Sequence, residues 1–153
     1  MAKGDRRSSR WKYISAISRL GEAKGIVHTK DLADELQVKP ASVTQMVKRL
    51  AGEGLLEYHP YQGVRLSELG VEEAGRIRER RLVLTQFFRL IGLSEDQSIS
   101  QAREMGSRLS RESFSRLKTL VERARRETGI DDEDCVVLRL GTDDGGIAKA
   151  MET

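Results

Sequence analysis

The chain of 153 residues contains one cysteine, two prolines and two histidines, and aromatic residues make up only 5% of it. A single thiol, Cys135, excludes an internal disulfide, and one thiol with two imidazoles is too little for a conventional zinc site. The sequence has no run of about eighteen apolar residues, and its charged start MAKGDRRSSR leads into no hydrophobic stretch. We therefore expect a cytoplasmic protein with no membrane span, built from one or two small domains.

Sequence motifs of catalysis are also missing. The chain has no Gly-x-Ser-x-Gly elbow, no phosphate-cradling glycine loop and no paired acids in an apolar setting. The glycine-rich stretch 141–146 includes Asp143 and Asp144, whose charges would repel a phosphate. The sequence therefore predicts a protein that is not an enzyme.

Charge is unevenly distributed, although the net charge is only +3. Residues 129–153 hold seven acidic and two basic side chains, a net charge of −5, which leaves +8 on residues 1–128. Clustered lysine and arginine attract polyanions through phosphate contacts and counterion release. A basic body with an acidic tail favours a nucleic-acid partner, and the competing interpretation is a solvated surface with an asymmetric tail.

Hydrophobic periodicity predicts a mainly α-helical fold. Residues 1–10 are typical of a basic flexible arm, and residues 11–70 form the first predicted domain. Within that domain, apolar residues recur at helical spacing over 11–24, 30–36 and 40–51, and the pattern changes to strand, turn and strand over 55–66. Two helices joined by a tight turn and followed by a small β-hairpin are typical of a winged helix-turn-helix domain.

The helix predicted over residues 40–51 has a polar outward face, which suits the major groove of DNA. Glutamine can make paired hydrogen bonds to adenine, whereas serine, threonine and lysine more often contact phosphate or a thymine methyl group. The predicted DNA-binding residues are Lys39, Pro40, Ala41, Ser42, Thr44, Gln45, Lys48 and, on the wing, Arg65. The arginines of the N-terminal arm suit phosphate or minor-groove contacts. A module that binds protein without DNA is the alternative of another class.

Residues 71–128 predict a helical linker and dimerisation domain. Helical spacing of apolar residues covers 68–91, 94–109 and 110–128, and Ser94-Glu95-Asp96-Gln97 predicts a capping box. Three such helices carry more apolar surface than a monomer of this size needs, so we expect a homodimer. Residues 129–153 are expected to form an acidic, partly disordered tail.

Three landmarks carry a resemblance to a known family: KDLA (30–33) with VKPASVT (38–44), LLEYHPYQGVRL (55–66) and QFFRLIGL (86–93). Together they resemble the diphtheria-toxin-repressor and manganese-transport-regulator family of metal-dependent repressors, over about residues 11–127. The third landmark falls in a long linker helix, which generic winged-helix proteins lack. The resemblance implies a cytoplasmic homodimer that binds palindromic operators in double-stranded DNA and regulates transcription, most simply as a repressor.

The resemblance also implies a metal site, and there the sequence departs from the family. The family's manganese branch takes carboxylate and imidazole ligands from the first helix, the linker helix and the helix after it. Those ligand positions fall here on Lys12, Ser15, Arg81, Arg103, Gly106 and Ser107. None is a carboxylate or an imidazole and three are permanent cations, so we expect no cofactor where the family would hold manganese or iron.

Several occupants of these degenerate positions are possible. Arg81 lies on an apolar stripe of its predicted helix, which suggests a partly buried guanidinium that needs a partner. One hypothesis supplies Glu104, Asp96 or the acidic stretch 131–134 as ion-pair partners, which gives a repressor that is competent without metal. A second makes the cations a pocket for a small anion such as phosphate, sulfate or an organic acid. Non-standard metal ligands, or unrelated solvated charges, are the remaining alternatives.

Overall fold

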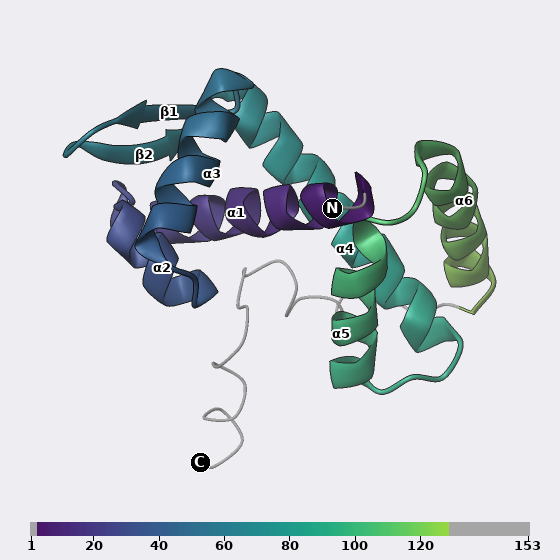
Figure 1. Ribbon diagram of the computed structural model, residues 1–153. Helices are drawn as coiled ribbons and strands as arrows, with labels where there is room; N and C mark the ends of the chain where they lie inside the picture. The colour runs from purple at the N-terminus through teal and green to yellow at the C-terminus, as the bar shows by residue number, and fades with distance from the viewer. Residues whose placement is uncertain (1–2, 129–153) are drawn as a thin grey trace, which may run out of the picture.

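The computed structural model describes residues 3–128 and folds them into six helices and one hairpin (Figure 1). The elements in chain order are α1 (Lys3–Lys24), α2 (Thr29–Leu36), α3 (Pro40–Gly52), β1 (Leu56–His59), β2 (Gly63–Leu66), α4 (Glu68–Leu90), α5 (Glu95–Gly106) and α6 (Arg111–Thr128). Helices α2 and α3 and the hairpin lie at one end of α1, while α5 and α6 lie at its other end, and α4 runs between the two groups. The predicted mainly helical, winged helix-turn-helix architecture is confirmed.

Local signals in the sequence set the limits of the helix-turn-helix. α2 begins after His28, whose backbone N–H donates to the Asp31 carboxylate at 2.8 Å. It ends at Leu36, and the next residue, Gln37, adopts the left-handed backbone conformation with φ 51°. Pro40 then occupies the first turn of α3, where its missing N–H removes no helical hydrogen bond. Residues 37–39 are therefore the tight turn that orients α3 against α2.

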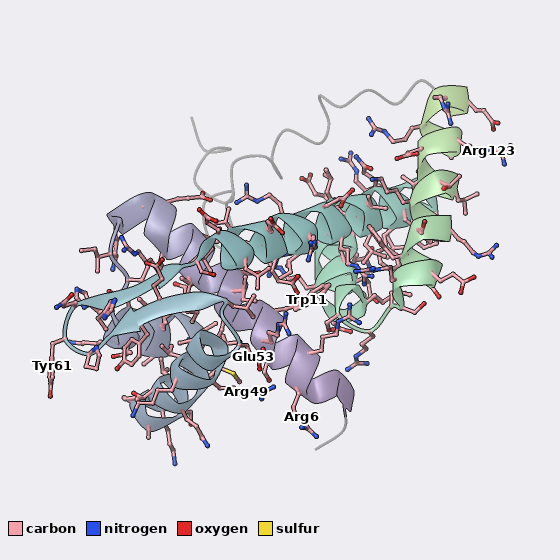
Figure 2. The ribbon with its side chains drawn as sticks, turned by 90° about the horizontal axis from the view of Figure 1, so that it is seen from above. Arg6, Trp11, Arg49, Glu53, Tyr61 and Arg123 are labelled. Atoms are coloured by element: carbon pink, nitrogen blue, oxygen red, sulfur yellow. The ribbon has the colours of Figure 1, made fainter. Side chains whose placement is uncertain are left out.

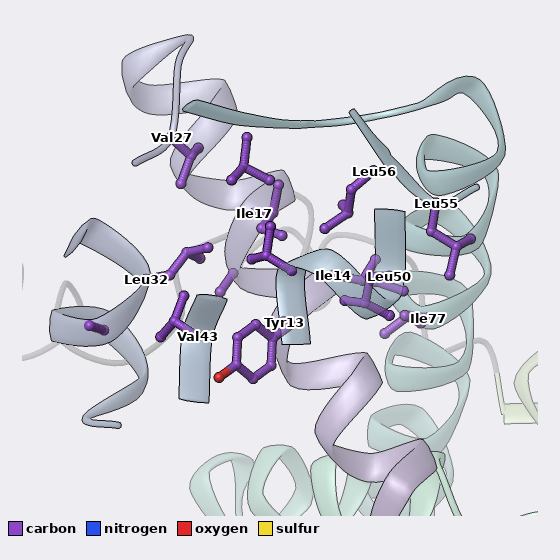
Figure 3. Packing of buried hydrophobic residues seen from close by; sticks show 14 residues of the cluster. Tyr13, Ile14, Ile17, Val27, Leu32, Val43, Leu50, Leu55, Leu56 and Ile77 are labelled. Carbon is purple, nitrogen blue, oxygen red and sulfur yellow. The ribbon is translucent and has the colours of Figure 1, made fainter. Parts of the chain in front are cut away.

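The wing is an antiparallel hairpin in which Leu56 pairs with Leu66 and Glu57 with Arg65. An isolated bridge from Val27 to the second strand ties the loop after α1 to the wing. Beneath the wing lies the main hydrophobic core, shared by α1, α2, α3, α4 and the hairpin (Figure 3). Its fully buried members include Ile14, Ile17, Val27, Leu32, Val43, Val47 and Leu50. Helix α1 is thus the central element of the winged domain.

Two smaller clusters hold the helical half together. The first joins α4 to α6, and its buried members are Val83, Phe114 and Val121. The second joins α4 to α5, and its buried members are Leu84, Phe88 and Ala102. The Ser94 N–H donates to the Gln97 amide oxygen at 3.1 Å, and the Gln97 N–H donates to the Ser94 hydroxyl at 3.3 Å. The predicted capping box therefore starts α5.

The N-terminal segment corrects one sequence-based expectation. Residues 3–10, predicted as a flexible arm, belong to α1, which begins at Lys3 and not near residue 11. The Arg10 guanidinium lies 3.4 Å from the Glu53 carboxylate and 3.3 Å from that of Glu73, and Arg7 donates to the Leu109 carbonyl at 3.4 Å. These partners are far away in the sequence, so a local pattern of small and basic residues gives no sign of them.

The start of α4 packs against the wing so closely that it requires glycine. A Cβ at Gly70 would overlap the carbonyl oxygen of Leu55. We expect Gly70→Ala to lower the free energy of unfolding by about 2 kcal/mol, because backbone must move to admit the methyl group. Gly75→Ala, in the same helix with open space around the added Cβ, should raise it by about 0.5 to 1 kcal/mol. Urea unfolding measures both, and effects of the same sign would contradict the close packing.

Candidate nucleic-acid interface and interhelical cavity

Helix α3 presents its polar side to solvent. Val43, Val47 and Leu50 are buried on its inner side, against the core of the winged domain. Tyr61, at the tip of the wing, is fully exposed and points away from the body (Figure 2). The structure gathers on the exposed face of α3 and its N-terminal cap the predicted residues Lys39, Pro40, Ala41, Ser42, Gln45 and Lys48.

Two of the predicted residues have partners inside the protein. Thr44 is half-buried, and its hydroxyl donates to the Pro40 carbonyl at 3.1 Å, which leaves only acceptor capacity for a ligand. Arg65 is an exposed residue of the wing, and its guanidinium lies 2.5 Å from the carboxylate of Glu57 on the opposite strand. Both are therefore weaker candidates for DNA contact than the exposed residues of α3.

The six degenerate positions meet in one cavity between the helices. α1 supplies Lys12 and Ser15, α4 supplies Arg81, and the end of α5 supplies the other three. The cavity has a volume of about 250 Å³. Within it the Arg81 guanidinium lies 3.5 Å from the Ser15 hydroxyl oxygen. Positions that are far apart in the sequence are therefore neighbours here.

Cations outnumber carboxylates among the described residues that line this cavity. Its lining cations are Lys12, Arg19, Arg81 and Arg103. Among the described residues, one carboxylate lines it, that of Glu35 on α2, and this group accepts a hydrogen bond from Arg19. Three hydroxyls, those of Ser8, Ser15 and Ser107, complete its polar lining. Sequence reasoning missed Arg19, Glu35 and Ser8, which no resemblance marked as ligand positions.

The same walls do not suit a divalent cation. Within the described part of the chain, no three His, Cys, Asp or Glu side chains gather closely enough to hold a metal ion. Asp96 and Glu104, two of the expected ion-pair partners, are exposed on α5 and lie outside the lining. Glu104 points about 100° around the helix from Arg103, and Asp96 lies two turns away. The third expected partner, the stretch 131–134, lies outside the described residues, as does the whole predicted tail.

The most deeply buried cation of this region is Arg80, whereas Arg81 is half-buried. Arg80 is only 7% exposed, and burial lowers the pKa of its guanidinium, with a further decrease from the nearby charge of Arg7. Its guanidinium donates to three backbone carbonyls: Gly106 at 3.0 Å, Leu109 at 2.9 Å and Ser110 at 3.3 Å. The last carbonyls of a helix lack helical partners and carry partial negative charge. Arg80 therefore supplies hydrogen-bond donors to the carbonyls at the end of α5 and in the turn before α6.

Trp11 of α1 packs against the same Arg80 guanidinium (Figure 2). The guanidinium carbons of Arg7 and Arg80 lie 5.2 Å and 5.6 Å from the centroid of its ring, and that of Arg80 also lies 4.6 Å from the ring of Phe114. A Cβ at Gly106 would lie 3.2 Å from the Trp11 ring. The indole therefore packs directly against one of the six degenerate positions, and a side chain there would make a tight contact that the ring must shift slightly to relieve.

We expect Arg80→Leu to lower the free energy of unfolding by about 3 kcal/mol, because three carbonyls lose a buried cationic donor. Arg80→Lys should recover only part of the loss, since an ammonium group cannot replace the planar fork of a guanidinium. Arg78→Leu, a change in the same helix as Arg80, breaks an exposed ion pair to Glu22 of α1 and should cost less than about 1 kcal/mol. Urea unfolding followed by circular dichroism compares the three variants. Equal losses at positions 78 and 80 would rule out this role for Arg80.

The fold defines a class of protein, a winged helix-turn-helix domain continued by a long helix into a second helical unit. Residues 8–64 match the family described as iron dependent repressor, N-terminal DNA binding domain. The chain is 36% identical over 110 residues to the HTH-type transcriptional regulator MntR of Bacillus subtilis (strain 168), a match that covers 72% of this chain and 78% of that protein. It is 34% identical to MntR of Lysinibacillus sphaericus (strain C3-41), over 72% of this chain and 79% of that one. The chain therefore belongs to the diphtheria-toxin-repressor and manganese-transport-regulator family of transcriptional regulators, as the resemblance indicated.

Solved structures share this fold. A manganese-dependent transcriptional repressor in complex with manganese matches with a TM-score of 0.65 and 22% identity, over 74% of this chain and 52% of that one. The hypothetical protein SSo2273 from Sulfolobus solfataricus matches with a TM-score of 0.64 and 18% identity, over 72% of this chain and 85% of that one. The curated relatives are transcriptional regulators and not enzymes, in agreement with the sequence. None of the helices between residues 3 and 128 is long and apolar enough to cross a membrane.

Proposed function

We propose that this chain is a DNA-binding transcriptional repressor that occupies a palindromic operator, in the cytoplasm, as a homodimer. The observation that carries the proposal is the exposed polar face of α3, the second helix of the helix-turn-helix. A helix of this kind fits the major groove, where the Gln45 amide can donate to and accept from one adenine while Lys48 and Lys39 reach phosphates. The family match over residues 8–64 supports the same role.

Exposed apolar residues on the helical half support the proposed homodimer. Ile91 is 57% exposed and Leu120 is 56% exposed, and pairing of two such surfaces would cover them. A symmetric pair would present two copies of α3, so that each reads one half of a palindrome.

We also propose that DNA binding needs neither manganese nor iron. Lys12, Arg81 and Arg103 would repel a divalent cation, and a side chain at Gly106 would place its Cβ only 3.2 Å from the Trp11 ring. The contacts of Arg80 and Trp11 already join α1, α4 and the turn after α5 without a metal. The chain would then be competent for DNA binding as folded.

The contribution of α3 is testable on an operator selected from a pool of random duplexes. We expect Gln45→Ala to weaken binding to that operator by about 5-fold to 100-fold and to relax base preference at one position per half-site, because an adenine contact is lost. Lys48→Gln should weaken binding to all duplexes alike and reduce the salt dependence of log K by about one unit. Ser115→Ala, an exposed change on α6, is the matched control. If no duplex is retarded by the wild-type chain at low ionic strength, the proposed function is wrong.

A separate experiment tests whether DNA binding requires a metal ion. After dialysis against a chelator, the full chain should bind the selected operator with an unchanged Kd, and added Mn²⁺, Fe²⁺ or Zn²⁺ should leave that Kd where it was. The physical reason is that no three His, Cys, Asp or Glu side chains gather to hold a metal ion among residues 3–128, where the cavity's described carboxylate, that of Glu35, is bonded to Arg19. The manganese-dependent repressor of the same fold is the positive control for the assay. Loss of binding in chelator that manganese reverses would contradict this part of the proposal.

A further inference from the structure

Trp11 contacts both halves of the molecule. Its indole packs against the hydrophobic core of the winged domain, where Ile14, three residues later in α1, is fully buried. The same ring lies 5.6 Å from the Arg80 guanidinium carbon, and a Cβ at Gly106 would lie 3.2 Å from it. Arg80 is bonded to the turn before α6, and Gly106 ends α5, so these contacts reach the helical half. A rotation of one half against the other therefore has to move the indole.

Two arginines from different helices meet at this ring. The Arg7 guanidinium carbon, from one turn before Trp11 in α1, lies 5.2 Å from the ring centroid. Arg7 and Arg80 also donate to the same carbonyl, that of Leu109, at 3.4 Å and 2.9 Å. Their like charges repel, whereas the negative face of an indole and a carbonyl oxygen attract both of them. We call Arg7, Trp11, Arg80 and the Leu109 carbonyl the Trp11 clamp.

The clamp restrains a motion that α4 alone leaves open. α4 is continuous from Glu68 to Leu90 and contributes to the cores of both halves. Long helices curve gently, so a single helix holds two domains at a set distance more firmly than at a set angle. The clamp adds a second connection, from the N-terminal end of α1 to the end of α5 (Figure 1). Two connections at different places resist rotation of one half against the other.

The length of α1 turns a small rotation into a large displacement. Its 22 residues span about 33 Å, so a tilt of about 10° at the clamp moves the far end by about 6 Å. That far end packs against α2 and the wing, which share one core with α3. A displacement of about 6 Å is close to the rise of two base pairs, at about 3.4 Å each. A change at Trp11 is therefore large enough to move α3 from one base pair to another.

We propose that Trp11 is a positioning residue, which holds the two α3 helices of a dimer at the separation of one operator and so selects the spacing of its half-sites. This role rests on the proposed function, because it requires a homodimer on a palindrome. The recognition helices of a symmetric pair read half-sites that lie about one helical turn apart, or a multiple of it. The clamp fixes each helix before DNA arrives, so less binding free energy is lost to ordering the two halves.

The test uses the operator selected from random duplexes and two altered forms of it, one with two base pairs inserted between the half-sites and one with a single half-site. Fluorescence anisotropy of labelled duplexes gives each Kd. We expect the insertion to weaken binding of the full wild-type chain by about tenfold or more, because one α3 helix no longer reaches its bases. Trp11→Leu should bind the selected operator about fivefold or more weakly, yet the insertion should cost it less than about threefold.

The single half-site separates positioning from folding. Trp11→Leu should bind that duplex as the wild type does, because α3 itself is unchanged. Partial unfolding of the winged domain would instead weaken binding to all three duplexes alike, without a change in the cost of the insertion. Because Trp11 is the single tryptophan of the sequence, acrylamide quenching of its emission measures exposure of the ring directly.

Further variants test the clamp itself. Trp11→Phe keeps an aromatic face and should retain most of the cost of the insertion. Arg7→Gln is an exposed change at a second partner of the ring, so it should lower that cost and increase quenching of the Trp11 emission. Arg108→Gln, an exposed change of the same charge beside the clamp, should alter neither. Circular dichroism checks that each variant is folded, and Arg7→Gln provides the test if Trp11→Leu does not fold.

The outcomes distinguish this role from the proposed function. Equal costs of the insertion for the wild type, Trp11→Leu and Arg7→Gln would overturn the role of Trp11, and so would equal weakening on all three duplexes. A wild-type chain that tolerates the insertion would overturn it too. In each of these cases the chain still binds DNA, so the proposed function stands. A wild-type chain that retards no duplex would mean that the proposed function is wrong, and the role of Trp11 with it.

Discussion

The arrangement of the two halves depends on the hydrogen bonds that the Arg80 guanidinium donates to backbone carbonyls. It is buried, yet the carbonyls at the end of α5 and in the following turn accept all the hydrogen bonds described for it. A buried cation is costly unless such acceptors surround it, and unpaired carbonyls at a helix end are costly unless a donor reaches them. The carbonyls therefore offset the cost of burying the cation, and the cation offsets the cost of leaving the carbonyls without helical partners. Because Trp11 packs on the same guanidinium, the contact also fixes the N-terminal end of α1.

Contacts with distant parts of the chain account for the length of α1, which exceeds what its local pattern indicates. Residues 3–10 contain small polar and basic side chains that have no helical periodicity of their own. They are helical because Arg7 bonds to a carbonyl in the turn before α6, and Arg10 bonds to the carboxylates of Glu53, just after α3, and of Glu73 on α4. Nothing within ten residues of Arg7 signals these partners, so reading of the sequence alone predicts a flexible arm.

Where boundary residues act locally, the sequence is sufficient. Pro40 marks the start of α3 in the helix-turn-helix, and the capping box from Ser94 to Gln97 marks the start of α5. The change of period after residue 54 marks the wing. Each of these signals was predictable from neighbours in the chain. The candidate site likewise has one part that local sequence predicts and one part that it does not. The polar face of α3 follows from helical spacing, whereas the cavity was predictable only through resemblance to a family whose ligand positions were known. The residues that no such position marked, Arg80, Trp11 and Glu35, were missed because they act through tertiary contacts.

Helix α1 connects the cavity to the proposed DNA-binding surface. Ser15 lines the cavity, while its neighbour Ile14 is fully buried in the hydrophobic core that also contains Val43 of α3. A close-packed core transmits a shift of one helix to those packed on it, because there is no empty space to absorb the movement. A shift of α1 at the cavity therefore acts on the element that also supports α3.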